Sequence, residues 1–291
     1  MSAVAVPIDK PAVAATGVRA FMRRHPGIAL GGLLLLAMVV VSVFAPWLGT
    51  VDPVMINPAA RLKPPSAEHW FGTDRFGRDV YSRVLYGGRV SLIVGLSVAA
   101  LSTLIGLCIG LASGFTRAVD AIVMRIMDGM MAIPAIMLAI ALIALSKASV
   151  AIVIIAVTLP EIPRVVRLVR GIVLTLREQP YIEAAIATGT SLPRILFRHL
   201  LPNAMPPLIV QATYVCASAV LIEAALSFLG AGTPPEIPSW GNIIAESRPY
   251  FQLKPSLVLL PGLFLALTVL AVNMVGDGLR DLLDPRLARK M

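Results

Sequence analysis

Six long apolar segments constrain the fold of this chain more than any other feature. A bilayer core requires about 20 mostly apolar residues per helix. The segments that reach this length lie at about 27–48, 89–114, 121–145, 148–168, 204–229 and 256–276. Only 14% of the 291 residues are charged, whereas a soluble domain carries about a quarter. The sequence therefore predicts an all-α integral membrane protein with six transmembrane helices.

Two of these segments are less regular than the others. Arg125 and Asp128 interrupt the third segment, and Pro160, Glu161 and Pro163 interrupt the fourth. Charged groups are costly in lipid, and proline removes a helical hydrogen bond. We expect neither segment to run straight through lipid.

The basic residues predict the orientation, because cytoplasmic segments carry an excess of Lys and Arg. We expect the N-terminal segment 1–26, the 161–203 loop and the C-terminal tail 283–291 to be cytoplasmic, and the 49–88 loop to lie outside. The net charge of +9 then reflects this excess and not nucleic-acid binding. In the outer loop, the run from Val80 to Val90 is predicted to form a short interfacial helix.

Motifs for catalysis are absent from the sequence. It contains no G-x-x-x-x-G-K-[ST] for phosphate binding, no H-E-x-x-H and no paired metal-ligand spacing. Its three histidines, His25, His69 and His199, lie outside the apolar segments. We therefore predict a protein that is not an enzyme, has no metal site and holds no cofactor.

A polar island at 181–203 separates the fourth and fifth apolar segments. Its sequence predicts two short helices joined by a turn. Pro180 suits the first turn of one helix and Gly189 its left-handed end. Ser191 is placed to cap the second helix, with Pro193 in its first turn.

The spacing in this island resembles the cytoplasmic EAA loop of binding-protein-dependent ABC importer permeases. The residues that carry the likeness are Glu183, Ala184, Ala185, Gly189, Leu201 and Pro202. His199 stands where the family pattern has Ile. The run Arg198–Asn203 is similar to the version found in dipeptide, oligopeptide and nickel permeases.

Further segments resemble the second permease of the pair in those importers. They include Phe71–Arg83, Glu223–Gly230, Pro238–Gly241 and Gly276–Arg286, in the expected order. One stretch departs from the pattern, since relatives often carry aromatic residues near Ile162 and Val165 and this chain has neither.

The resemblance implies a MetI-like ABC importer permease core at 89–282, after a first helix and outer loop at 27–88. It also implies a bacterial cell-membrane location with both termini cytoplasmic. The partners would be a homologous permease, two cytoplasmic ATPases that bind ATP and Mg, and an extracytoplasmic binding protein. Short peptides are the expected cargo, and nickel chelates are the alternative. The competing class is an ion-coupled secondary transporter, which would need no ATPase.

The resemblance also assigns candidate residues. The ATPase-coupling set is Glu183, Ala184, Ala185, Gly189, His199, Leu201 and Pro202. Candidates for the translocation path or gate are Asp128, Glu223, Ser227 and Asn273.

For three residues the expected contacts are more specific. Asp128 is expected to pair with Arg125, three residues away on the same helix. Glu223 alternatively hydrogen-bonds across helices and serves packing. Trp240 is expected to face outside, as an interfacial anchor or a contact for the binding protein.

Overall fold

The computed structural model describes residue 22, residues 25–146 and residues 148–283. Most of the expected cytoplasmic tails, 1–26 and 283–291, therefore lies outside the described residues. The helices are α2 (Pro26–Val43), α3 (Val80–Phe115), α4 (Arg117–Met131), α5 (Ala135–Ala144), α6 (Val150–Arg177), α7 (Pro180–Ala187), α8 (Leu192–Ile195), α9 (Leu201–Phe228), α10 (Trp240–Ser247) and α11 (Ser256–Leu283), with short turns η1 (Ala45–Trp47), η2 (Pro58–Ala60), η3 (Leu196–Leu200) and η4 (Arg248–Tyr250).

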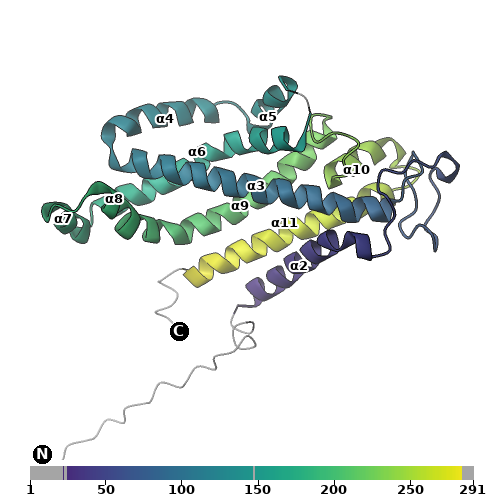
Figure 1. Ribbon diagram of the computed structural model, residues 1–291, viewed down its shortest axis with the longest axis horizontal. Coiled ribbons are helices and arrows are strands. Elements are labelled where there is room, and N and C mark those ends of the chain that lie inside the picture. Colours follow the sequence, from purple (N-terminus) through teal and green to yellow (C-terminus); the bar gives the residue numbers. More distant parts are fainter. Residues whose placement is uncertain (1–21, 23–24, 147, 284–291) are drawn as a thin grey trace, which may run out of the picture.

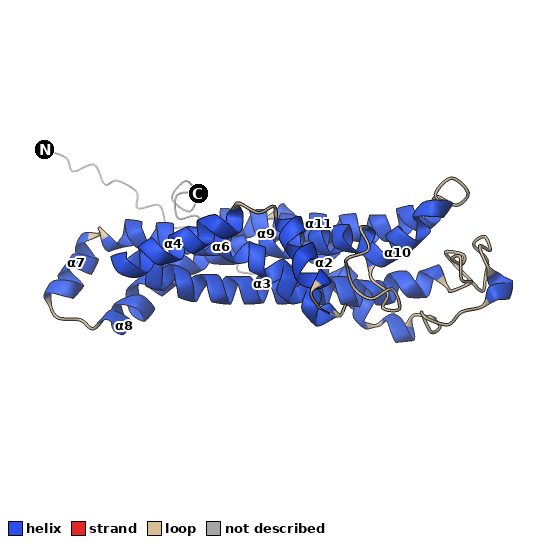
Figure 2. Cartoon of the chain, turned by 90° about the horizontal axis from the view of Figure 1, so that it is seen from above, coloured by secondary structure: helices blue, strands red, loops and turns tan. Residues whose placement is uncertain are grey.

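The long helices lie side by side, with α4 and α5 along one flank of the bundle (Figures 1 and 2). α7 and α8 occupy one end, and α10 and the loop between α2 and α3 occupy the other. α2 begins, and α11 ends, on the side where α7 lies. The arrangement therefore places the helix ends that lead to both termini on one side.

Four helices are long and apolar enough to cross a membrane: α2, α3, the continuous helix Leu192–Phe228, and α11. A fifth span results if α4 and α5 are counted together. α6 is as long as a span, but Glu161, Arg164 and Arg167 lie in its middle. By length and composition alone the described helices give four or five spans, compared with the six expected from the sequence.

The two irregular segments behave differently from one another. α4 and α5 meet at an 86° bend, which confirms that the 121–145 segment is broken. α6 instead continues as one helix past Pro160 and Pro163 and extends to Arg177, although it is not among the helices that are apolar enough to cross a membrane.

The predicted interfacial helix at Val80 to Val90 is also wrong, because this run forms the first turns of α3. The Asp79 carboxylate accepts a hydrogen bond from the Ser82 backbone N–H at 2.7 Å and begins the helix. At 36 residues, α3 is about 54 Å long and exceeds the thickness of a bilayer core. The boundary expected between residues 88 and 89 thus falls inside a helix.

The packing of α3 against α6 brings two backbones close together. Three glycines of α3 face three valines of α6, in the pairs Gly106–Val165, Gly110–Val169 and Gly114–Val173. A Cβ added to these glycines would lie 2.5–2.7 Å from the Cβ of the facing valine. Small residues spaced by four allow such contact between helices in a membrane.

Trp240 at the start of α10 is fully buried, and its expected role as an interfacial anchor or a contact for the binding protein is wrong. Its indole Nε1–H donates to the Val84 carbonyl at 3.0 Å. The ring also packs beside Phe264 of α11. A large amphipathic ring with its N–H bonded fills a core position where α3, α10 and α11 meet.

A buried ion cluster joins the outer loop to α10. Glu246 accepts hydrogen bonds from the guanidinium groups of Arg78 and Arg83, and Arg78 also pairs with Asp74 at 2.6 Å. The Arg83 side chain is only 1% exposed. A charge this deeply buried depends on its partners, since water cannot replace them.

We expect Glu246→Leu to lower the free energy of unfolding by about 2 kcal/mol, because the substitution leaves Arg83 buried with one distant carboxylate. The measurement is the apparent unfolding temperature of the detergent-purified protein. Glu236→Leu, at an exposed position in the preceding loop, is the matched control. An unchanged unfolding temperature for Glu246→Leu contradicts the structural role of the cluster.

Candidate functional site

The first half of the 181–203 island has the local structure that the sequence predicts. α7 begins at Pro180 and is closed by Gly189, which has φ +76°. The Gly189 N–H donates to the Ile186 carbonyl, and the Thr190 N–H donates to the Ala185 carbonyl, each at 3.0 Å. These two bonds form a Schellman motif, which fixes the direction in which the chain leaves the helix.

The second half differs from the prediction of a separate short helix. α8 continues through the π-helical turn η3 into α9, so that Leu192–Phe228 is one helix of 37 residues. Ser191 occupies the N-cap position, but its side chain makes no capping hydrogen bond. The predicted side-chain cap is therefore wrong, while Pro193 lies in the first turn as expected.

Apolar contacts hold α7 against the start of this long helix. The side chains of Ile182, Ile195 and Leu200 are almost completely buried and belong to the main hydrophobic cluster of the molecule. The Tyr181 and His199 rings lie 6.2 Å apart. His199 thus contacts the opposite half of the island and contributes to its shape.

The opposite face of the island is open. Glu183, Ala184 and Gly189 are exposed, and Ala185 is half-buried. Within the part of the chain that the structure describes, Glu183 makes no side-chain hydrogen bond or ion pair. Glu183 therefore does not tie the two halves of the island together, and its carboxylate is free to meet another protein.

The remaining coupling candidates lie where α9 begins. Leu201 is half-buried, and Pro202 is exposed in the first turn. Phe197, 69% exposed, lies beside a hollow of about 630 Å³ that also carries Arg194 and Arg198. The island thus exposes small, apolar and basic residues, and α7 and α8 lie at one end of the molecule (Figure 2).

Of the four candidates for a path or gate, only Glu223 and Ser227 are hydrogen-bonded to each other among the described residues. Glu223 in α9 is fully buried, and it accepts hydrogen bonds from the hydroxyls of Ser227 at 2.9 Å and Ser91 of α3 at 3.4 Å. This is the cross-helix contact expected of a packing role. Asn273 in α11 is half-buried and makes no side-chain hydrogen bond among the described residues.

Asp128 pairs with Arg167 of α6 at 2.6 Å, and the expected pairing with Arg125 is wrong. The Asp128 carboxylate is directed at the neighbouring helix. Asp120, two turns earlier on α4, likewise forms an ion pair with Arg170 of α6. The charges of α4 therefore bind α4 to α6.

Three polar residues of α6 and α9 were not among the candidates from the sequence. Glu161 is 2% exposed, pairs with Arg164 at 3.0 Å, and accepts a hydrogen bond from the Ser218 hydroxyl of α9 at 3.2 Å. The charge of Glu161 and Arg164 within an apolar segment could have identified them from the sequence, because charged groups in such segments usually face a bundle interior or a water-filled cavity.

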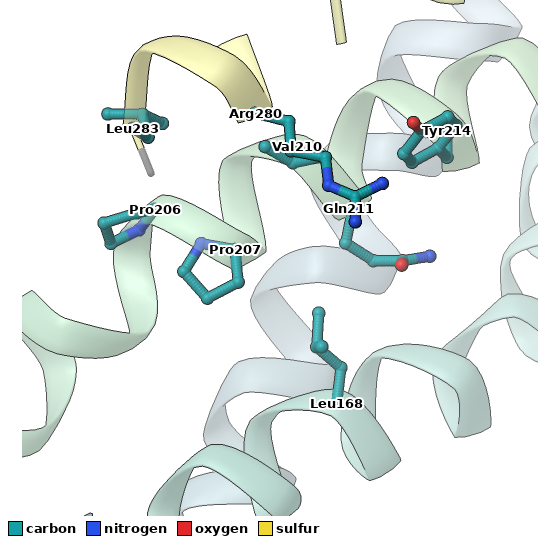
Figure 3. Close-up of a pocket in the computed structure, with 8 residues that line it drawn as sticks. All are labelled: Leu168, Pro206, Pro207, Val210, Gln211, Tyr214, Arg280 and Leu283. Carbon is teal, nitrogen blue, oxygen red and sulfur yellow. The ribbon is translucent and has the colours of Figure 1, made fainter. Parts of the chain in front are cut away.

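Next to these groups, a pocket of about 340 Å³ opens between α6, α9 and α11 (Figure 3). Its lining consists of Leu168, Pro206, Pro207, Val210, Gln211, Tyr214, Arg280 and Leu283. The Arg280 guanidinium extends from α11 toward Gln211 of α9. The Tyr214 hydroxyl donates to the Asp277 carboxylate and links α9 to α11.

Comparison with protein families gives the origin of this arrangement. Residues 102–289 match the family described as "Binding-protein-dependent transport system inner membrane component". The chain belongs to this family. Residues 18–65 match a second description, the N-terminal transmembrane domain of oligopeptide transport permease C. The resemblance to the second permease of such importers is thereby confirmed.

The relatives of this permease cover nearly its whole length. It is 51% identical, over 92% of each chain, to the probable peptide ABC transporter permease protein y4tQ of Sinorhizobium fredii. It is 41% identical to the di/tripeptide transport system permease protein DppC of Pseudomonas aeruginosa, over 89% of this chain and 88% of that one. For the oligopeptide transport system permease protein OppC of Bacillus subtilis the identity is 38%, over 91% and 88%.

A solved structure supports the fold. An inward-facing form of the MetNI methionine ABC transporter contains a chain that is 22% identical to this permease, with a TM-score of 0.56. The match covers 69% of this permease and 96% of that chain. The fold is therefore all-helical and MetI-like. As a member of its family, the chain is a multi-pass, non-catalytic membrane subunit of a transport system that includes a binding protein.

Proposed function

We propose that this permease forms part of the translocation path of an ATP-driven importer of short peptides. Support comes from the relatives, whose names specify peptides, dipeptides, tripeptides and oligopeptides. In this proposal α2, α3, the α4–α5 pair, α6, α9 and α11 make six crossings of a bacterial cell membrane, with both termini in the cytoplasm. α7 then lies on the cytoplasmic side together with the basic residues Arg194 and Arg198 that follow it. Residues 161–177 of the expected 161–203 loop belong instead to α6.

The partners follow from the kind of importer. A homologous permease completes the path as a heterodimer, two cytoplasmic ATPases hold ATP and Mg, and an extracytoplasmic protein delivers the peptide. This permease contributes no cofactor of its own. The ATPases would bind the open face of α7, where Ala184 and Gly189 leave space for side chains of another protein.

The observation that carries the proposal is the short connection of α7 to two long helices. Two residues separate the end of α6 at Arg177 from the start of α7 at Pro180, and four residues separate α7 from α8, which continues into α9. Buried Ile182 fixes α7 to the same hydrophobic cluster that contains the α6 and α9 side chains. A displacement of α7 by an ATPase would therefore tilt α6 and α9 together, which is a rigid-body route to alternating access.

Vesicles containing the complete importer test this proposal. With binding protein outside and ATP inside, we expect uptake of a labelled dipeptide that stops without ATP. In the same vesicles, Glu183→Lys is expected to lower the uptake rate by at least about tenfold while the protein still inserts, because reversal of a desolvated charge at an interface costs several kcal/mol. Glu236→Lys makes the same change on an exposed residue at the opposite end and is expected to transport normally.

The alternatives predict other outcomes in these vesicles. A nickel-chelate importer takes up the chelate and is not inhibited by excess peptide. An ion-coupled secondary transporter takes up substrate without ATP when a membrane potential is applied. Either outcome overturns the peptide importer, and normal uptake by Glu183→Lys overturns the coupling role.

A further inference from the structure

Polar side chains form a row along the boundary between α6 and α9, which we call the α6–α9 seam. It consists of Glu161 and Arg164 of α6 with Gln211, Tyr214 and Ser218 of α9. Spacings of three and four residues place each set on one face of its helix. The hydrogen bond from Ser218 to Glu161 joins the two sets.

Arg164 lies at the middle of α6. The helix runs from Val150 to Arg177, so that Arg164 is about 20 Å from either end at 1.5 Å per residue. Its side chain is 57% exposed, whereas Arg167, one turn further, is turned toward α4 and pairs with Asp128. An arginine at this depth facing lipid is strongly unfavourable, whereas arginines that face a water-filled cavity are common in transporters. The seam therefore faces water.

The contacts of Arg164 hold it in place and leave most of its donors free. Buried Glu161 accepts one hydrogen bond from Nη1 of Arg164 at 3.0 Å, and Ser218 orients the same carboxylate. No other hydrogen bond of Arg164 occurs among the described residues, so four of the roughly five N–H donors of a guanidinium group remain available. A planar guanidinium fixed in this way is suited to bidentate recognition of a carboxylate.

Two hollows extend the seam toward the end where α7 lies. One, of about 430 Å³, is lined by Arg167, Gly171 and Thr175 of α6 and their neighbours. The other is the pocket of about 340 Å³ that holds Gln211 and Arg280 (Figure 3). Both include Leu168. The two hollows therefore adjoin at Leu168, which lies one helical turn beyond Arg164.

We propose that the α6–α9 seam lines the aqueous path and that Arg164 binds the terminal carboxylate of the peptide as it passes. This inference rests on the proposed function. Peptides of every sequence share a C-terminal carboxylate, and a single arginine at a fixed depth therefore suits varied cargo. Glu161 stays paired with Arg164 and partly neutralises its charge. The attraction between Arg164 and the peptide carboxylate is therefore weak enough for the peptide to leave after it has bound.

The test compares a dipeptide with its C-terminally amidated form in vesicles that contain the complete importer. The quantity measured is the ratio of their uptake rates. Selectivity of the binding protein contributes equally to every variant, so a change in the ratio reports on the permease. For Arg164→Gln we expect the ratio to fall about tenfold, because a charge-assisted bidentate contact is lost. Arg164→Lys keeps the positive charge but lacks the planar guanidinium that binds a carboxylate through two hydrogen bonds. Its uptake ratio should therefore lie between those of Arg164→Gln and the unmodified permease.

Arg61→Gln, which removes an exposed arginine of the outer loop, serves as the control and should leave the ratio unchanged. Equal losses for both peptides in Arg164→Gln overturn carboxylate binding and assign Arg164 to a contact with the second permease. An unchanged ratio also overturns it. A complete absence of ATP-dependent uptake with every variant, including the unmodified chain, instead rejects the proposed function.

A labelling experiment tests the aqueous position separately. With Cys108 and Cys216 replaced by serine, Arg164→Cys should react with a membrane-impermeant thiol reagent in the assembled importer. Ile155→Cys, 56% exposed and about two and a half turns earlier on the opposite side of α6, should not react. Failure of Arg164→Cys to react while a cysteine in the outer loop does react contradicts a water-filled seam.

Discussion

Gly189→Val is expected to lower ATP-driven uptake by about tenfold or more while the importer still assembles in the membrane. Gly189 has φ +76°, a conformation that costs a β-branched residue of the order of 2 kcal/mol. Relief of this strain requires the turn between α7 and α8 to open, which breaks the two Schellman hydrogen bonds at Gly189 and Thr190. α7 would then move without carrying α9 with it.

The measurement is the number of peptides transported per ATP hydrolysed, in vesicles with saturating binding protein. Gly189→Asn is the matched control, since asparagine adopts the left-handed conformation at little cost. No added Cβ would meet another atom at this position, so that the two variants differ in backbone strain and not in a clash. Equal coupling ratios for Gly189→Val and Gly189→Asn contradict the requirement for a rigid turn.

The sequence predicts the first half of this island well because the determinants are local. A proline at the helix start and a glycine at its end act within a few residues, and both Pro180 and Gly189 lie where their backbone preferences place them. The second half depends on distant contacts. Ser191 and Pro193 indicate a helix start, but nothing near them indicates that the helix continues to Phe228. That continuity is stabilised by burial of Leu200 and Leu208 in the main hydrophobic cluster.

Contacts between side chains of different helices were also not predictable from the local sequence. Spacing along α4 makes Arg125 and Asp128 potential partners, yet Arg167 from a different helix takes the carboxylate. Trp240 was predicted to be an interfacial anchor or a contact for the binding protein, and it is buried because α3 and α11 pack around it. In each case the deciding contact comes from another helix, which the local pattern does not specify.

The contact made by the glycines of α3 depends on a local sequence pattern and also on a partner from another helix. Their spacing at 106, 110 and 114 is visible in the sequence and is typical of close helix contacts in membranes. Only the structure identifies the partner, a valine row at 165, 169 and 173 of α6. Because α6 also carries the seam and leads into α7, the contact between α3 and α6 supports every functional element described above.

Gly110→Val is therefore expected to have the largest effect on stability, a loss of about 3 kcal/mol in the free energy of unfolding. An added Cβ would lie 2.6 Å from the Val169 Cβ and 3.1 Å from the Val166 carbonyl oxygen. Neither atom is the end of a flexible side chain, so the clash is relieved only if the two helices separate. The measurement is the apparent unfolding temperature of the detergent-purified permease, together with the fraction that remains monodisperse.

Gly32→Val provides the matched control, because an added Cβ at this position in α2 meets no atom within 4 Å. Its effect should stay within about 0.5 kcal/mol, as expected from helix propensity alone. In the double variant Gly110→Val with Val169→Gly, the bulk moves from α6 to α3 and part of the lost stability should return. If the double variant is no more stable than Gly110→Val alone, the close contact between these two positions is not what holds α3 to α6.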